Sequence, residues 1–309
     1  MKLAISGKGG VGKSTIAGTL ARLYAADGHR VLAIDADPDA NLASAVGLPP
    51  ELRARLRTIA TERELIEERT GAKVKEFGQM FSLNPEVSDI ADKYAQRYAG
   101  VDVLVLGAVK RAAGGCACPE SVLLKALVLH LVLKRGEVVI LDMEAGIEHL
   151  GRGTAMGVDL MLSVVEPGKR SFETAHRVRD MASALGIHQF GIVLNKSVAP
   201  AEEREWVAAE FGADRLLGVI PFDPRIAMAD RLGSSLMELG HEDLLEPFRR
   251  LQQALNSYSP NHPPEPRAGS HPSDPKPWSL GTPGSHPSNP KPGLLGTPGS
   301  LGAPKEKIQ

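Results

Sequence analysis

The stretch that most constrains the fold is Ile5–Thr15, where a short apolar run gives way to four glycines and then to Lys-Ser-Thr. From Gly7 onward it fits the pattern G-x-x-x-x-G-K-[ST], which occurs where a strand passes into a helix. Glycines allow consecutive backbone N–H groups to turn toward a polyphosphate, which also meets the positive end of the following helix. The pattern therefore predicts a nucleotide-binding loop rather than an ordinary glycine-rich turn.

Two side chains of this loop have specific expected tasks. The Lys13 ammonium is expected to reach the β- and γ-phosphates, and the Ser14 hydroxyl is expected to bind Mg²⁺. Lys13 is also a candidate catalytic residue, because its charge would balance the charge that develops on the phosphate. The nucleotide-binding candidates of the loop are Gly7, Lys8, Gly9, Gly10, Val11, Gly12, Lys13, Ser14 and Thr15.

The order of apolar and helical segments predicts the fold class of residues 1–257. Short apolar runs alternate with longer helical stretches, which is typical of a mostly parallel sheet with helices on both faces. We therefore expect one α/β P-loop NTPase domain, with residues 50–100 forming helices and loops at the sheet edge. The expected strands after the first are 30–34, 101–109, 137–141, 158–166, 190–194 and 216–220.

Residues 258–309 have a different composition, rich in Pro, Gly and Ser, and they contain an imperfect repeat. The segment Gly269–Pro277 returns in nearly the same form as Gly284–Pro292. Such a sequence cannot bury enough apolar surface to offset the entropy lost on ordering. We expect this tail to be disordered and to add nothing to the core.

Charge and hydropathy argue against several classes of function. Lys and Arg (36) nearly balance Asp and Glu (37), for a net charge of −1, so no global electrostatic attraction to nucleic acid or membranes is expected. The longest apolar stretch, Val122–Leu133, contains Lys125 and His130 and is too short to span a bilayer. Because the first strand starts at the N-terminus, we expect no signal peptide and a cytoplasmic protein.

The only two cysteines, Cys116 and Cys118, precede a helix that is expected to begin at Pro119. A helix N-terminus favours thiolate over thiol, and thiolate is the form that binds soft metals. Two sulfurs cannot complete a tetrahedral site, whereas two chains related by a twofold axis supply four. The alternative is a pair of small residues that only pack.

Carboxylates follow two of the expected strands, at the sheet edge where ligands bind in open α/β sheets. Asp35, Asp37 and Asp39 follow the strand at 30–34, and Asp142 closes the strand at 137–141. Taken in isolation, the first three favour a solvated turn.

With Lys8 ahead of its glycines, the loop Lys-Gly-Gly-Val-Gly-Lys-Ser-Thr resembles the deviant Walker A loop of the MinD, ParA, ArsA and nitrogenase iron-protein class. The resemblance implies an ATPase that dimerises around ATP, with Lys8 reaching the partner's phosphates. It implies that Asp37 positions the attacking water and contacts the Mg²⁺ shell. It also implies that Asp142 is the Walker B group that holds Mg²⁺, and that the Gly146 N–H senses the γ-phosphate.

The same resemblance places adenine contacts at two strand ends. Asn195 would read the edge of the base, and the backbone from Pro221 to Asp223 would flank the ring. Asn, Pro and Asp are also common turn residues, which is the alternative at both places.

Two further segments narrow the resemblance: Gly-Cys-Ala-Cys-Pro, and Glu-His-Leu-Gly-Arg-Gly after Asp142. With the loop, they resemble the CooC-type ATPases, accessory proteins that mature nickel carbon monoxide dehydrogenase. The resemblance covers residues 1–257 and implies an ATP-hydrolysing homodimeric metallochaperone. Its cofactors would be ATP and Mg²⁺, and Ni²⁺ or Zn²⁺ would bridge Cys116 and Cys118 of both chains. Its client would be carbon monoxide dehydrogenase or a related acetyl-CoA synthase. Glu144 departs from the proline of the MinD pattern.

Two other functions compete with this one. A MinD-like positioning ATPase would need a basic amphipathic terminal helix, and Pro247–Leu255 offers only two adjacent arginines. A ParA-like positioning ATPase would need a stripe of basic surface residues to bind DNA, and the sequence does not show one. An iron–sulfur carrier would also use four thiolates across a dimer.

Overall fold

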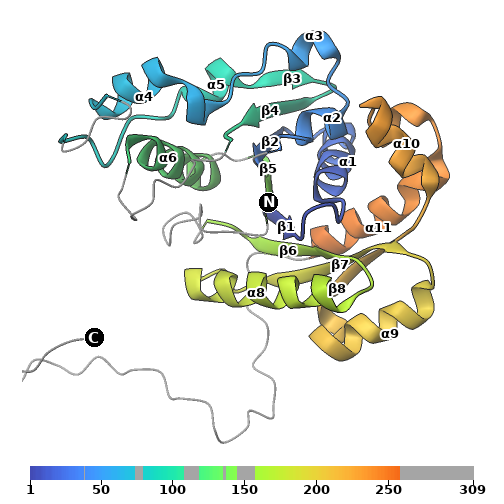
Figure 1. The fold of residues 1–309 in the computed structure, drawn as a ribbon. Helices are drawn as coiled ribbons and strands as arrows, with labels where there is room; N and C mark the ends of the chain where they lie inside the picture. Colours follow the sequence, from blue (N-terminus) through green and yellow to red (C-terminus); the bar gives the residue numbers. More distant parts are fainter. Residues whose placement is uncertain (38, 74–78, 108–117, 135–136, 145–156, 258–309) are drawn as a thin grey trace, which may run out of the picture. The chain divides into compact units, whose positions relative to one another are not determined.

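The structure is a computed structural model of residues 1–309, and it describes all of them except residues 38, 74–78, 108–117, 135–136, 145–156 and 258–309 (Figure 1). The chain divides into two units, Met1–Pro263 and Pro264–Gln309. Described residues occur only in the first unit. The tail at 258–309, Cys116 and Gly146 lie outside them, and the domain boundary at 257 stays a prediction.

A mostly parallel sheet forms the centre of the first unit (Figure 1). Its eight strands lie in the order β3-β4-β2-β5-β1-β6-β7-β8, and neighbours pair in parallel except for the antiparallel edge pair β3–β4. The strands are β1 Lys2–Gly7, β2 Val31–Ala36, β3 Gln96–Tyr98, β4 Val101–Val105, β5 Val138–Met143, β6 Leu160–Val165, β7 Phe190–Ser197 and β8 Leu216–Pro221.

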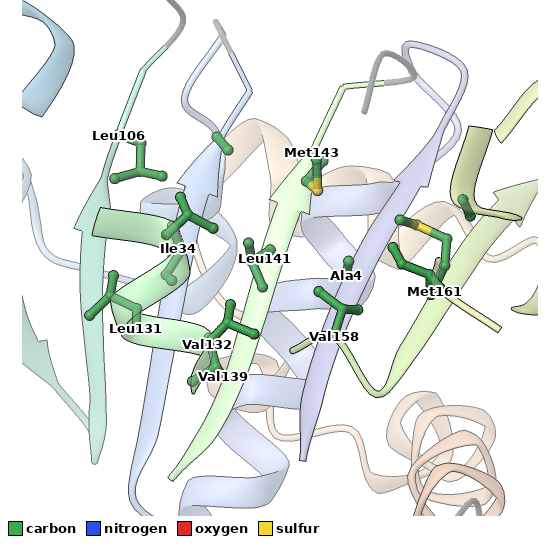
Figure 2. Packing of buried hydrophobic residues seen from close by; sticks show 14 of the residues in the cluster. Ala4, Ile34, Leu106, Leu131, Val132, Val139, Leu141, Met143, Val158 and Met161 are labelled. Atoms are coloured by element: carbon green, nitrogen blue, oxygen red, sulfur yellow. The ribbon is translucent and has the colours of Figure 1, made fainter. Parts of the chain in front are cut away.

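Apolar side chains of the central strands are buried on both faces of the sheet, as expected where helices cover both. Alternate residues of β1 belong to different core clusters: Ala4 to one, Leu3 and Ile5 to the other. Figure 2 shows the first cluster, which contains Leu131 of the helix after β4 together with the β5 residue Val139.

The helices divide between these two faces. Helices α4, α5, α6, α8 and α9 contribute side chains to the first cluster, and α1, α2, α10 and α11 to the second. This arrangement confirms the predicted fold class. The helices are α1 Lys13–Ala26, α2 Leu42–Val46, α3 Pro50–Arg53, α4 Arg63–Thr70, α5 Ile90–Tyr94, α6 Pro119–Lys134, α8 Lys169–Leu185, α9 Pro200–Phe211, α10 Pro224–Leu232 and α11 Glu242–Ser257, with short 3₁₀ turns at Ile59–Thr61, Ala213–Arg215 and Leu236–Leu239.

One part of the chain differs from expectation. The described residues of 50–100 form helices and loops as predicted, but they also contain the edge strand β3, which no apolar run announces. Helix α11 is amphipathic and buries Leu251 and Leu255 in the second core cluster. Among the described residues, no helix combines the length and apolar character that crossing a membrane requires.

Candidate nucleotide-binding site

The predicted phosphate loop leaves the C-terminal end of β1 and enters α1 at Lys13. Gly10 and Gly12 have φ values of 79° and 95°, a left-handed backbone that favours glycine. Gly12 has a second requirement, because a Cβ atom there would lie 2.3 Å from Nδ2 of Asn195. The glycines predicted from the motif are therefore needed for both the turn and the close approach of β7.

Lys13 is paired with the acidic turn after β2. Its Nζ atom lies 3.5 Å from Oδ2 of Asp37, and the two side chains are only 6% and 13% exposed. The structure thus brings together the two candidates whose roles in phosphate binding and water activation were predicted separately. Asp39 and Asn41 of the same turn are exposed.

The turn itself is organised by Asp35, for which no separate role was predicted. The Asp35 carboxylate accepts the backbone N–H of Asp37 at 3.1 Å and that of Leu42 at 2.9 Å. Burial raises the pKa of Asp35 to about 6, although both backbone hydrogen bonds favour its charged form. Asp35 is therefore a positioning residue for Asp37, and its only signal was the Asp-x-Asp spacing of a side-chain-to-backbone turn.

Asp142 lies opposite Asp35, because β2 and β5 pair in parallel with these residues in register. Its side chain is fully buried, and neither carboxylate oxygen has a hydrogen-bond partner of normal geometry. Burial raises the pKa of Asp142 to about 7, whereas the Ser14 hydroxyl and, more weakly, the Lys13 charge favour the ionised form.

These residues fit the Mg²⁺ that accompanies ATP. An unpartnered buried carboxylate beside a hydroxyl supplies the hard oxygen donors that Mg²⁺ prefers. Mg²⁺ usually takes one or two carboxylates and completes its shell with water and phosphate oxygens. Ser14 and Asp142 would hold the ion, with Asp37 at the edge of the same cluster.

The other nucleotide candidates occupy three different environments. The Lys8 side chain is exposed at the loop tip, which the predicted contact with a second chain requires. Asn195 is buried and donates from Nδ2 to the Val11 carbonyl at 2.7 Å. Pro221 is exposed at the end of β8, and the Asp223 carboxylate caps α10 and is held by Arg225.

The cysteine segment is described only from Cys118 onward. Helix α6 begins at Pro119 as predicted, and the Cys118 carbonyl accepts the Val122 N–H at 3.1 Å, which places Cys118 at the cap. The expected thiolate is not favoured in this chain, because burial raises the pKa of Cys118 more than the Ser121 N–H lowers it. The prediction of a low pKa from the helix end alone was therefore wrong.

The comparisons with known proteins agree with this geometry. The sequence matches the family described as the CobQ/CobB/MinD/ParA nucleotide binding domain over residues 2–236. It is 48% identical over 244 residues to the carbon monoxide dehydrogenase accessory protein CooC of Rhodospirillum rubrum, covering 77% of this chain and 90% of that protein. It is 44% identical over 238 residues to an uncharacterized ATP-binding protein of Methanocaldococcus jannaschii, covering 76% and 91%.

Among solved structures, the fold is similar to the MinD cell division protein of Aquifex aeolicus. The TM-score is 0.60 at 19% identity, over 84% of this chain and 98% of that one. At this identity the likeness concerns the fold alone.

Proposed function

Because the chain belongs to the CobQ/CobB/MinD/ParA family of nucleotide-binding domains, we propose that this ATPase is an accessory protein that inserts nickel into carbon monoxide dehydrogenase or a related acetyl-CoA synthase. The observation that carries the proposal is the 48% identity to the CooC protein of Rhodospirillum rubrum over most of both chains. The Cys-x-Cys pair ahead of α6 supplies the donor atoms that a soft metal cargo requires.

The ATPase chemistry is phosphoryl transfer to water at the C-terminal edge of the sheet. Lys13 and the N–H groups of the Gly7–Thr15 loop bind the phosphates, and their charges and dipoles oppose the charge that develops in the transition state. Asp37, held by Asp35 beside Lys13, orients the attacking water. Mg²⁺ held by Ser14 and Asp142 would neutralise charge on the β- and γ-phosphates.

The metal cargo requires two chains. Cys116 and Cys118 give two sulfurs per chain, whereas a closed site for Ni²⁺ or Zn²⁺ takes about four ligands. We therefore propose a homodimer in which both pairs hold one ion and in which Lys8, exposed at the loop tip, reaches the phosphates on the second chain.

The position of helix α11 supports a MinD-like positioning role less than it supports the metal-insertion role. The C-terminal amphipathic helix α11, which would have to bind the membrane, buries its apolar residues Phe248, Leu251 and Leu255 in the core. Releasing that face would expose a large part of the second cluster.

Calorimetric titration with Ni²⁺, in the presence of a non-hydrolysable ATP analogue, tests the metal site. We expect one ion per two chains, and a severe loss of affinity in Cys116→Ser and in Cys118→Ser. Ser121→Ala is the matched control, since it keeps the backbone N–H that faces Cys118 and should bind as the wild type does. One tightly bound ion per chain, or full affinity in either serine variant, would contradict the bridging site.

Activation of metal-free carbon monoxide dehydrogenase by nickel tests the client. Wild-type protein with ATP should accelerate activation, and neither Cys118→Ser nor Lys13→Ala should do so. Equal activation by all three would show that nickel delivery depends neither on Cys118 nor on Lys13.

A further inference from the structure

Strand β7 contains one residue more than its partner β8 at the end that faces the phosphate loop. Leu194 pairs with Val219 and Ser197 with Pro221, so three steps along β7 match two along β8. The bulge falls at Asn195 and Lys196, and Lys196 has a left-handed backbone with φ 56°. For a residue other than glycine this conformation costs about 1 kcal/mol, so the surrounding structure has to hold it in place.

The bulge changes where the two side chains point. In a regular strand, consecutive side chains point to opposite faces of the sheet. Here both reach the same loop: Asn195 Nδ2 donates to the Val11 carbonyl at 2.7 Å, and Lys196 Nζ donates to the Gly10 carbonyl at 2.7 Å. Bulges commonly re-aim side chains in this way next to active sites.

Holding these two carbonyls fixes the direction of two N–H groups. A peptide unit is planar and trans, so its N–H points opposite to its C=O. With the Gly10 and Val11 carbonyls turned toward β7, the N–H groups of Val11 and Gly12 point away from β7, into the loop. The Val11 N–H donates within the loop to the Lys8 carbonyl at 3.4 Å, a long bond that a phosphate oxygen would replace.

Lys196 is itself held by the end of β6. Its ammonium pairs with Glu166, and the Glu166 backbone N–H donates to the buried Ser171 hydroxyl of α8 at 3.0 Å. The phosphate loop is thereby tied to α8 through Lys196 and Glu166.

We propose that Asn195 and Lys196 are positioning residues that pre-organise the phosphate loop, with Glu166 orienting Lys196. They hold two loop carbonyls outward so that the N–H groups face the polyphosphate before it binds. The inference rests on the proposed role of the Gly7–Thr15 loop in binding phosphate and is independent of the metal function. It also assigns Asn195 a task beyond any contact with the base.

A polyphosphate that lacks a base separates loop positioning from base recognition. The measured quantities are KM and kcat for ATP, and the inhibition constant of inorganic tripolyphosphate in the same assay. For Lys196→Met we expect KM and the inhibition constant to rise together by about tenfold, the effect of losing a hydrogen bond from a charged donor. The kcat value should change less than twofold, because loop ordering affects bound substrate and transition state equally. Lys196→Arg, which keeps a cationic donor, should recover most of the loss.

Two further variants keep the test decisive. Lys169→Met removes a nearby exposed charge on α8 that contacts no part of the loop among the described residues, and should change either constant less than twofold. Glu166→Gln should raise both constants about twofold to fivefold, because it removes a partly exposed ion pair. If Lys196→Met fails to fold, the Glu166→Gln variant alone tests the inference.

Three outcomes would overturn the inference. A rise in KM without a rise in the tripolyphosphate constant would place Lys196 at the base. Unchanged constants in Lys196→Met and Glu166→Gln would show that the loop needs no such support. If tripolyphosphate inhibits neither the wild type nor any variant, the phosphate-loop role itself fails, and the inference with it.

Discussion

The Nζ atom of Lys13 lies 3.5 Å from Oδ2 of Asp37, and both side chains are almost completely buried. The pair joins the phosphate loop to the acidic turn after β2. Removing either partner leaves the other as an uncompensated buried charge.

Lys13→Ala should abolish ATP hydrolysis. The lysine supplies the charge that faces the β- and γ-phosphates, and losses of about 10²–10³-fold follow the removal of one such group. Phosphate release from saturating ATP is the measurement. Asp39→Ala is the control, because this exposed carboxylate of the same turn should leave the rate within twofold. Comparable rates in wild type and Lys13→Ala would remove Lys13 from the site.

Lys8→Ala should reduce both hydrolysis and ATP-dependent dimerisation. The side chain is exposed at the loop tip, so its contribution requires a second chain. Sedimentation velocity with a non-hydrolysable ATP analogue measures the second effect. Dimerisation equal to that of the wild type would show that Lys8 does not act across an interface.

Stability should depend on pH through Asp142. Burial raises its pKa to about 7 in the folded chain, against an ordinary value near 3.8. Asp35 opposite it, Asp37 and Lys13 face the same carboxyl, and the two buried aspartates titrate as a pair. The folded state therefore binds the proton more tightly, and the resulting stability, complete below about pH 4, is lost as the pH rises through about 7.

Asp142→Asn removes this titration and provides the comparison. Thermal unfolding without nucleotide or divalent cations should give similar melting temperatures for variant and wild type near pH 4, where the stabilisation of the wild type is complete. Near pH 8 the variant should be the more stable, because asparagine buries no charge. Melting profiles that run parallel from pH 4 to pH 8 would contradict the burial argument.

Deleting residues 258–309 should leave hydrolysis unchanged and the melting temperature within about 2 °C, less than the shift expected from 1 kcal/mol. The reason is compositional, since the segment is rich in Pro, Gly and Ser. Scanning calorimetry of both chains is the measurement, and a larger drop in melting temperature would show that the tail packs on the domain.

The sequence predicted those features that a single segment determines. Apolar runs marked the parallel strands, and the Gly7–Thr15 pattern marked the loop. Strand β3 carries the polar residues Gln96 and Arg97 and forms only because it pairs with β4, so no local signal announced it. The burial of Asp35 and Asp142 depends on the register of β2 and β5.

Two other features depend on neighbours that no motif specifies. The bulge at Lys196 exists only relative to β8, and Glu166 enters the site through the pairing of β6 with β7. The pKa of Cys118 rises because surrounding elements bury the thiol, an effect that outweighs the helix end.

The close approach of Asn195 to Gly12 limits how this protein could be redesigned for another nucleotide. The family resemblance predicts that Asn195 also reads the base, so an exchange of this side chain would be the obvious way to alter base preference. An Asn195→Asp substitution would place a carboxylate oxygen against the Val11 carbonyl, which now accepts a hydrogen bond from Asn195. The space is also tight, because a Cβ atom on Gly12 would clash with the Asn195 side chain. Selectivity for the base and affinity for phosphate therefore cannot be tuned separately at this position, and a new specificity would have to be built from the β8 side.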